Sequence, residues 1–158
     1  MPEKDHAIAQ VKALEQLLTL FGSVKAAIVQ TLSDQARTPP MGLRMLQLCA
    51  RQPGITPQAL AEGSGRDKAQ ITRLVKMLLE EGLLERQPHP QDKRSYSLWL
   101  TPQGQQALHT FEHAQALVAS QLFGELSAAQ LQAQTAQWAA LNTRLSDVMQ
   151  MTAHVNRA

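Results

Sequence analysis

The chain of 158 residues has few of the features that would mark it as secreted or membrane-bound. It contains one cysteine, Cys49, which excludes an internal disulfide and fits a reducing compartment. No apolar run reaches the length of a membrane span, and residues 1–10 carry charges where a signal peptide needs an apolar stretch. We therefore expect a cytoplasmic protein with no membrane partner.

Aromatic residues are also scarce, with two Trp, one Tyr and three Phe, which argues against a fold built on sheets. Ala, Leu and Gln are abundant instead, and these residues favour helices. The hydrophobic fraction of 44% and the charged fraction of 18% are typical of a folded globular protein, and the length fits a single domain. We therefore expect one mostly helical domain.

Charge is distributed unevenly, although the net charge of the whole chain is only +2. Residues 37–94 contain ten basic and six acidic side chains, whereas the segments on either side are each slightly acidic. A basic central segment favours a polyanionic partner. Glu80, Glu81 and Glu85 are expected to lie on the side away from such a partner.

Both ends of the chain show the pattern of long amphipathic helices. Apolar residues recur every three or four positions from Ile8 to Leu32. A Thr-Pro pair at residues 101–102 starts a second helix that runs to about Phe123, and a capping box at Ser127 starts a third. The apolar seam of the third helix consists of Leu131, Trp138, Leu141, Leu145, Val148 and Val155. Because these stripes exceed what one small domain can bury, we expect them to form a homodimer interface.

The central segment predicts three short helices. The first begins at the prolines of residues 39–40, and its buried side consists of Leu43, Leu46 and Cys49. Thr56 caps the second helix, which is expected to end where Gly-Ser-Gly at residues 63–65 interrupts it. A capping box at Asp67 starts the third helix, and Gly82 ends it. Its buried stripe consists of Ile71, Leu74, Val75, Leu78 and Leu79. The second and third helices together predict a helix-turn-helix.

After Gly82 the apolar residues alternate with polar ones. Residues 83–87 are predicted to form a strand, residues 88–93 a turn, and residues 96–100 the return strand. The fold class is therefore mostly α: a winged helix-turn-helix with a small β-hairpin wing, flanked by long N- and C-terminal dimerisation helices. We divide this one integrated domain into an N-terminal dimerisation helix, a winged helix-turn-helix DNA-binding region and C-terminal helices that complete the dimer interface, at residues 1–36, 37–101 and 102–158.

The exposed side of the third short helix predicts a surface that reads DNA. Gln70, Thr72 and Arg73 lie opposite the buried stripe, and Gln and Arg can read base edges in the major groove. The basic tip of the hairpin, Lys93 and Arg94, would reach the neighbouring backbone or the minor groove. The predicted DNA contacts are Thr56, Gln58, Lys68, Gln70, Thr72, Arg73, Lys76, Lys93 and Arg94. The alternatives are a solvated helix face and, for the first two residues, a role limited to capping and solvation.

Four fragments of the sequence resemble the MarR family of bacterial transcriptional regulators. They are LAE, ITRLVKMLLEEGLLER, DKR and LTPQG, at residues 60–62, 71–86, 92–94 and 100–104. Their order and spacing agree with the family pattern over about residues 56–104. The resemblance implies a sequence-specific transcriptional regulator, expected to be a repressor, that binds a pseudo-palindromic operator in double-stranded DNA as a homodimer. It also implies that Asp92 braces the wing and that Arg94 enters the minor groove, with Lys93 where Arg is common.

The resemblance further implies an effector ligand. Small aromatic anions are the usual ligands of the family, and nothing in this sequence selects one. The candidate pocket residues are Met41, Arg44, Met45 and His113. Such a ligand would act by changing the separation of the two DNA-reading helices, provided that it prefers one separation.

Two motifs leave alternatives open. His109, Glu112 and His113 match an inverted zinc-peptidase signature, but no third ligand is evident, so we assign no catalytic residue, metal site or cofactor. A zinc-responsive regulator of the same fold that uses His109 and His113 remains an alternative, as does a winged-helix protein-interaction module without DNA binding. Cys49 is expected to be a buried, inert thiol, with a peroxide sensor as the alternative.

Overall fold

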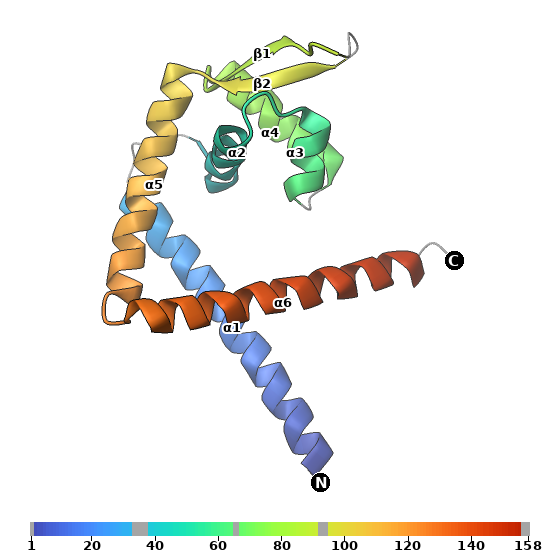
Figure 1. The fold of residues 1–158 in the computed structure, drawn as a ribbon, viewed down its shortest axis with the longest axis vertical. Coiled ribbons are helices and arrows are strands. Elements are labelled where there is room, and N and C mark those ends of the chain that lie inside the picture. Colours follow the sequence, from blue (N-terminus) through green and yellow to red (C-terminus); the bar gives the residue numbers. More distant parts are fainter. Residues whose placement is uncertain (1, 33–37, 65–66, 92–94, 156–158) are drawn as a thin grey trace. The chain divides into compact units, whose positions relative to one another are not determined.

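The computed structural model describes residues 2–32, 38–64, 67–91 and 95–155, which form six helices and one hairpin (Figure 1). The elements are α1 (Pro2–Leu32), α2 (Pro40–Arg51), α3 (Pro57–Ser64), α4 (Lys68–Glu80), β1 (Leu84–Pro88), β2 (Tyr96–Leu100), α5 (Pro102–Phe123) and α6 (Ala128–Val155). The predicted fold class is confirmed: a mostly helical chain with a helix-turn-helix, a hairpin wing and long terminal helices. The chain divides into two compact units, residues 1–118 and 119–158.

The core of the first unit is built mainly from α2, α3, α4 and the hairpin, with Leu108, Phe111 and Ala114 of α5. Its largest fully buried side chains are Leu43, Met45, Leu46, Cys49, Leu60, Ile71, Val75, Leu78 and Leu98. The predicted buried sides of α2 and α4 are thus confirmed, with Leu74 and Leu79 half-buried at the margin of the cluster. Burial of these side chains is the main force that joins the short helices, none of which is long enough to be stable alone.

Three of the predicted helix starts form the expected hydrogen bonds. The hydroxyl oxygen of Thr56 accepts a bond from the Ala59 N–H at 3.2 Å. The hydroxyl oxygen of Thr101 accepts one from the Gly104 N–H at 3.0 Å. Ser127 forms a reciprocal capping box, in which its N–H donates to Gln130 Oε1 at 2.8 Å and its Oγ accepts from the Gln130 N–H at 3.3 Å.

The end of α3 agrees with the prediction, whereas the start of α4 differs from it. Helix α3 continues through Gly63 and Ser64, and the Ser64 hydroxyl donates to the carbonyl of Ala61 at 3.0 Å. A single glycine costs a helix only about 1 kcal/mol, so α3 includes Gly63 and ends at Ser64, inside the predicted Gly-Ser-Gly break. Asp67 occupies the N-cap position of α4, but its side chain makes no capping hydrogen bond. The predicted capping box at Asp67 is therefore wrong.

The end of α4 is closed by backbone hydrogen bonds. The Leu83 N–H donates to the Leu78 carbonyl at 2.9 Å, and the Gly82 N–H donates to the Leu79 carbonyl at 3.1 Å. Gly82 has a φ of 68°, in the left-handed region that residues with a Cβ rarely adopt. This arrangement is a Schellman motif, which confirms the predicted role of Gly82.

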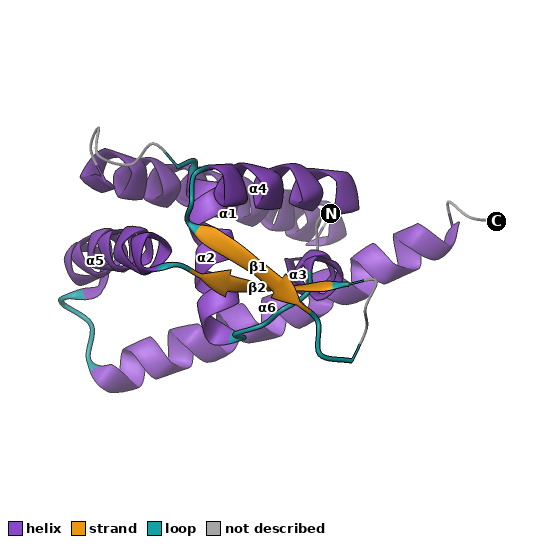
Figure 2. Cartoon of the chain, turned by 90° about the horizontal axis from the view of Figure 1, so that it is seen from above, coloured by secondary structure: helices purple, strands orange, loops and turns teal. Residues whose placement is uncertain are grey.

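The hairpin is antiparallel, and its two strands lie side by side (Figure 2). Its register pairs Leu84 with Leu100, Arg86 with Leu98, and Pro88 with Tyr96. These six residues share one face of the hairpin, because side chains alternate along a strand. Leu84 and Leu98 on this face are buried in the core. The wing is therefore attached to the helices through this face.

The start of α5 packs directly against the end of α4. The Thr101 hydroxyl donates to the Gly82 carbonyl at 2.6 Å, and the Thr101 N–H donates to the Leu83 carbonyl at 3.2 Å. A Cβ added at Gly104 would lie 2.0 Å from the Leu83 carbonyl oxygen. The backbones can approach this closely only because residue 104 is glycine.

Helix α1 joins the core only at its C-terminal end. Leu32 is buried and Ile28 packs against the core cluster. Farther toward the N-terminus, Ile8, Leu18 and Phe21 expose 66%, 63% and 71% of their surface. Most of the predicted apolar stripe on α1 is therefore uncovered in the single chain.

The second unit contains the end of α5 and α6. The rings of Phe123 and Trp138 pack with their centroids 5.9 Å apart. Along α6, Leu141, Leu145 and Val148 are exposed. Among the described residues, we find no helix with both the length and the hydropathy to cross a membrane.

The close approach at Gly104 predicts that Gly104→Ala destabilises the fold. The added methyl group would meet a backbone carbonyl that cannot move alone, so we expect the free energy of unfolding to fall by about 1–3 kcal/mol. Urea denaturation measures this change. Gly63→Ala is the matched control, because a Cβ at Gly63 meets nothing within 4 Å. Helix propensity predicts that this control leaves stability unchanged or raises it by up to about 1 kcal/mol. Equal effects of the two substitutions would contradict the prediction.

Candidate nucleic-acid interface

Helix α4 has two chemically different sides. Ile71, Val75 and Leu78 are buried, whereas the five polar side chains predicted to contact DNA on this helix are exposed. These are Lys68, Gln70, Thr72, Arg73 and Lys76. The helix therefore presents three cationic side chains and two neutral hydrogen-bonding ones to its surroundings. A helix of this kind has the size and the chemistry that the major groove of DNA admits.

The exposed side chains of α4 form two rows. Gln70 and Arg73 are three residues apart and lie on one row. Thr72, Lys76 and Glu80 are four residues apart and lie on the other, which borders the hairpin. The Thr72 hydroxyl donates to the Lys68 carbonyl at 2.8 Å, a local bond within the helix. The second row thus lines a groove beside the hairpin, and the first row does not.

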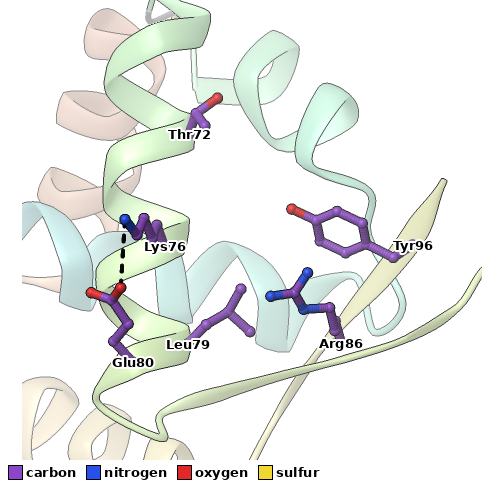
Figure 3. Close-up of a pocket in the computed structure, with 6 residues that line it drawn as sticks. All are labelled: Thr72, Lys76, Leu79, Glu80, Arg86 and Tyr96. Carbon is purple, nitrogen blue, oxygen red and sulfur yellow. Dashed lines mark ion pairs between the residues drawn. The ribbon is translucent and has the colours of Figure 1, made fainter.

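This groove lies between α4 and the hairpin and has a volume of about 320 Å³ (Figure 3). It is lined by Thr72, Lys76, Leu79, Glu80, Arg86 and Tyr96. The guanidinium carbon of Arg86 lies 5.4 Å from the centre of the Tyr96 ring, within the range of a cation–π contact. Lys76 Nζ lies 3.7 Å from Glu80 Oε1. The groove therefore brings two cations and one carboxylate together.

Arg86 is a functional candidate that the sequence interpretation missed. It lies inside the fragment that resembles the MarR family, but it was not selected as a DNA contact. The signal that could have found it is strand alternation, which places Arg86 on the same face as the buried Leu84. That face points toward α4, so Arg86 joins the groove. Glu80 also lines the groove. The expectation that Glu80 lies away from DNA stays a prediction.

The predicted contacts on α3 have partners within the protein. Thr56 is half-buried and caps the helix through its hydroxyl oxygen. Gln58 is exposed, and its side-chain amide donates to Glu62 Oε1 at 3.0 Å. Both residues thus fill the capping and solvation role that was weighed against phosphate contact. A DNA contact by either of them stays a prediction.

The predicted contacts at the tip of the wing are Lys93 and Arg94, with Asp92 as the brace. These three residues lie outside the described residues. Their assigned roles stay predictions.

The four candidate pocket residues occupy different environments. Met45 is part of the buried core and Met41 is half-buried, whereas Arg44 and His113 are exposed. Arg44 donates a hydrogen bond to the side chain of Gln47. Gln47 is buried and donates in turn to Gln115 Oε1 of α5 at 3.2 Å. The structure therefore connects α2 to α5 through two glutamines that the sequence interpretation did not single out.

The histidines of α5 lie on its surface. His109, Glu112 and His113 are all exposed. In residues 2–32, 38–64, 67–91 and 95–155, no group of three or more His, Cys, Asp or Glu side chains is placed to hold a metal ion.

Cys49 lies in the core, with 1% of its surface exposed. Removal of the thiol from water raises its pKa to about 12, because burial disfavours the charged thiolate. The thiolate is the reactive form of cysteine, so the expected buried thiol is in an environment that suppresses its chemistry.

The sequence is similar to known transcriptional regulators. A model of the MarR family matches residues 42–96. Transcriptional regulator HosA of Escherichia coli O127:H6 is 30% identical over 117 residues, which span 74% of this chain and 84% of HosA. A Thauera aromatica protein named for the hcr operon is 43% identical over 70 residues, or 44% of this chain and 42% of that protein. The transcriptional repressor YetL of Bacillus subtilis is 37% identical over 67 residues, or 42% of this chain and 40% of YetL.

The fold is shared with solved structures at lower sequence identity. A MarR protein from Peptoclostridium difficile has a TM-score of 0.75 at 18% identity, with 85% of this chain and 88% of that chain covered. The complex of S. aureus MepR with DNA has a TM-score of 0.73 at 19% identity and covers 82% and 94%. PcaV of Streptomyces coelicolor, crystallised with its natural ligand, has a TM-score of 0.67 at 22% identity and covers 84% and 89%. At these identities the likeness shows the fold alone.

The burial of Cys49 predicts that its thiol is inert in the folded chain. With a pKa of about 12, only about one thiol in ten thousand is ionised at pH 8, and the side chain is also inaccessible. We expect an aromatic disulfide reagent to react with the native protein far more slowly than with the protein in urea. The matched control carries Cys49→Ala and Ala50→Cys, which moves the thiol to an exposed neighbouring position. Equal native rates for the two proteins would show that Cys49 is accessible.

Proposed function

We propose that this chain, which belongs to the MarR family of DNA-binding transcriptional regulators, is a repressor that binds a pseudo-palindromic operator as a homodimer. The family consists of regulators and not of enzymes. The observation that carries the proposal is the division of α4 into a buried apolar side and an exposed side with Lys68, Arg73 and Lys76. The proposed reading region is residues 37–101, and the proposed interface comes from residues 1–36 and 102–158.

The outer row of α4 is the proposed base-reading surface. Arg73 can donate two hydrogen bonds to guanine, and Gln70 can both donate to and accept from adenine. Lys68 and Lys76 have no planar fork and would contact phosphates as point charges. The wing would place Arg94 in the minor groove, with Lys93 near the backbone and Asp92 as the brace. In this assignment Thr56 and Gln58 stay candidate phosphate contacts at the start of α3.

The homodimer is supported by the apolar side chains that α1 and α6 leave exposed. The most exposed of them on α1 are Ile8, Val11, Leu14, Leu18 and Phe21, and those on α6 are Leu141, Leu145, Val148, Met149 and Met151. Each set recurs at helical spacing, so each forms a continuous stripe. Stripes of this kind are the usual surface of a self-complementary interface. Two copies would then present two α4 helices to the two halves of an operator.

Two parts of the proposal come from relatives: that the chain represses transcription, and that an effector ligand controls it. YetL, which shares part of the sequence, is named a transcriptional repressor. PcaV, which shares the fold, was crystallised with its natural ligand. We propose that a small aromatic or anionic effector shifts this chain between two separations of its α4 helices. Met41, Arg44, Met45 and His113 remain the candidate pocket residues. The effector can change DNA affinity only to the extent that it prefers one separation.

The exposed stripes predict a dimer that a single charged substitution in either stripe should dissociate. Leu18→Glu or Leu145→Glu would bury an unpaired carboxylate at the interface, so we expect monomers or unfolded chains at micromolar concentration. Sedimentation velocity distinguishes these states. Thr143→Glu, on the opposite side of α6 from Leu145, is the control and should remain dimeric. A wild-type chain that sediments as a stable monomer would rule out the interface.

The separate roles proposed for the base-reading and the backbone-contacting residues can be tested by titrating variants on DNA duplexes. Arg73→Ala or Gln70→Ala should cost about 1–3 kcal/mol on the specific site and relax the preference at one base pair of each half-site. Arg94→Ala should instead weaken binding to every sequence and reduce the salt slope by about one for each phosphate charge that Arg94 would otherwise neutralise. The measurement compares an operator selected from a random pool with its scrambled version at two salt concentrations.

The control for these titrations is Lys12→Ala, which removes a charge from α1 without touching the proposed surface. Its affinities should match those of the wild type on both duplexes. If Arg73→Ala weakened both duplexes equally, or if Arg94→Ala changed only sequence preference, the assigned roles would be wrong.

A further inference from the structure

Ala69 is an apolar residue in the middle of the polar side of α4. It is exposed, and among the described residues it belongs neither to the hydrophobic core nor to the side chains that pack against the core. It lies two residues before the buried Ile71, which turns it by about 200° around the helix and places it opposite the core. Its neighbours on that side, Arg73 and Lys76, are charged. The methyl group of Ala69 is therefore available to contact a bound molecule.

Ala69 also lies at the end of α4 that suits base contact. It is the second residue of α4, and in a helix-turn-helix the N-terminal residues of the reading helix contact base edges. Ala69 is three residues before Thr72 and four before Arg73, so it lies between the two exposed rows of the helix. If α4 enters the major groove as proposed, the Ala69 methyl group faces the base edges.

The chemistry of the Ala69 side chain limits the base that it can recognise. A methyl group neither donates nor accepts hydrogen bonds, and the apolar group that base pairs present in the major groove is the C5-methyl of thymine. Contact between two methyl groups removes both from water, which is favourable. The small side chain of alanine also lets the helix backbone lie close to the base edges. Thymine is therefore the base that Ala69 fits.

We propose that Ala69 is a specificity-determining residue whose methyl group contacts the C5-methyl of a thymine in each half-site. The proposal rests on the proposed DNA-binding function, and it adds an apolar base contact to the polar contacts of Gln70 and Arg73. Ala69 and Arg73 are separated by about 6 Å along the helix axis, which is close to two base-pair steps of about 3.4 Å. The thymine therefore lies within about two base pairs of the one that Arg73 reads.

The first test removes the methyl group from the DNA. Uracil pairs with adenine as thymine does and lacks only the C5-methyl. In an operator selected from a random pool, each thymine of one half-site is replaced in turn by uracil, and the full-length protein is titrated on each duplex. We expect the wild type to bind about fourfold more weakly at one position, within about two base pairs of the one where Arg73→Ala relaxes the preference. Unchanged affinity at every position would overturn the proposal.

The second test removes the methyl group from the protein. The loss of affinity on replacing that thymine by uracil should vanish in Ala69→Gly, because the thymine methyl then has no partner. The matched control is Ala129→Gly, since Ala129 is also exposed and is also the second residue of its helix, α6. Glycine weakens both helices alike, so the control should keep the full effect of uracil. An effect of uracil that persists in Ala69→Gly would overturn the proposal.

Thr72 is the neighbouring residue that could make the same contact, because threonine also carries a methyl group. Thr72→Ser removes this methyl group and keeps the hydroxyl that donates to the Lys68 carbonyl. We expect Thr72→Ser to keep the effect of uracil. Loss of the effect in Thr72→Ser, with the effect kept in Ala69→Gly, would assign the thymine to Thr72 and overturn the proposal while the DNA-binding function stands. Failure of the wild type to bind any duplex would overturn both.

Discussion

The close approach between the start of α5 and the end of α4 is the constraint on which the DNA-binding unit depends. The Leu83 carbonyl accepts the Thr101 N–H at 3.2 Å, and only a glycine at position 104 leaves room for this hydrogen bond. The residues between these two points form the hairpin, so the same interaction closes the base of the wing. It also joins the start of α5 to the end of α4.

The chemistry of the candidate site depends on α4, whose different sides have different roles. One side holds the core together through Ile71, Val75 and Leu78. The remaining surface is free for polar residues, and strand pairing adds Arg86 beside them. The residues that stabilise the fold and those proposed to contact DNA thus lie on different sides of the same helix. Substitutions on the exposed rows should have little effect on folding, since surface changes usually have small effects on stability.

Local sequence patterns predicted most of the fold because they report short-range interactions. Proline and threonine at positions 56–57 and 101–102 started helices where expected, since the capping hydrogen bond forms within one turn. Gly82 ended α4 for an equally local reason, its left-handed backbone. One failure was also local: the side chain of Asp67 does not cap α4. A cap depends on the direction of the chain before it, which the residue types do not specify.

The sequence by itself determined the order of the helices, the buried sides of α2 and α4 and the basic character of residues 37–94, because these properties depend on periodicity and composition. Only the tertiary structure decided which polar side chains meet. Arg86, Tyr96 and Glu80 are separated along the chain, and they reach one groove because the hairpin register and the packing of β1 on α4 bring them there. The same holds for Gln47 and Gln115, whose hydrogen bond joins α2 to α5. Contacts between distant segments depend on how elements pack, and no pattern within a single element specifies that packing.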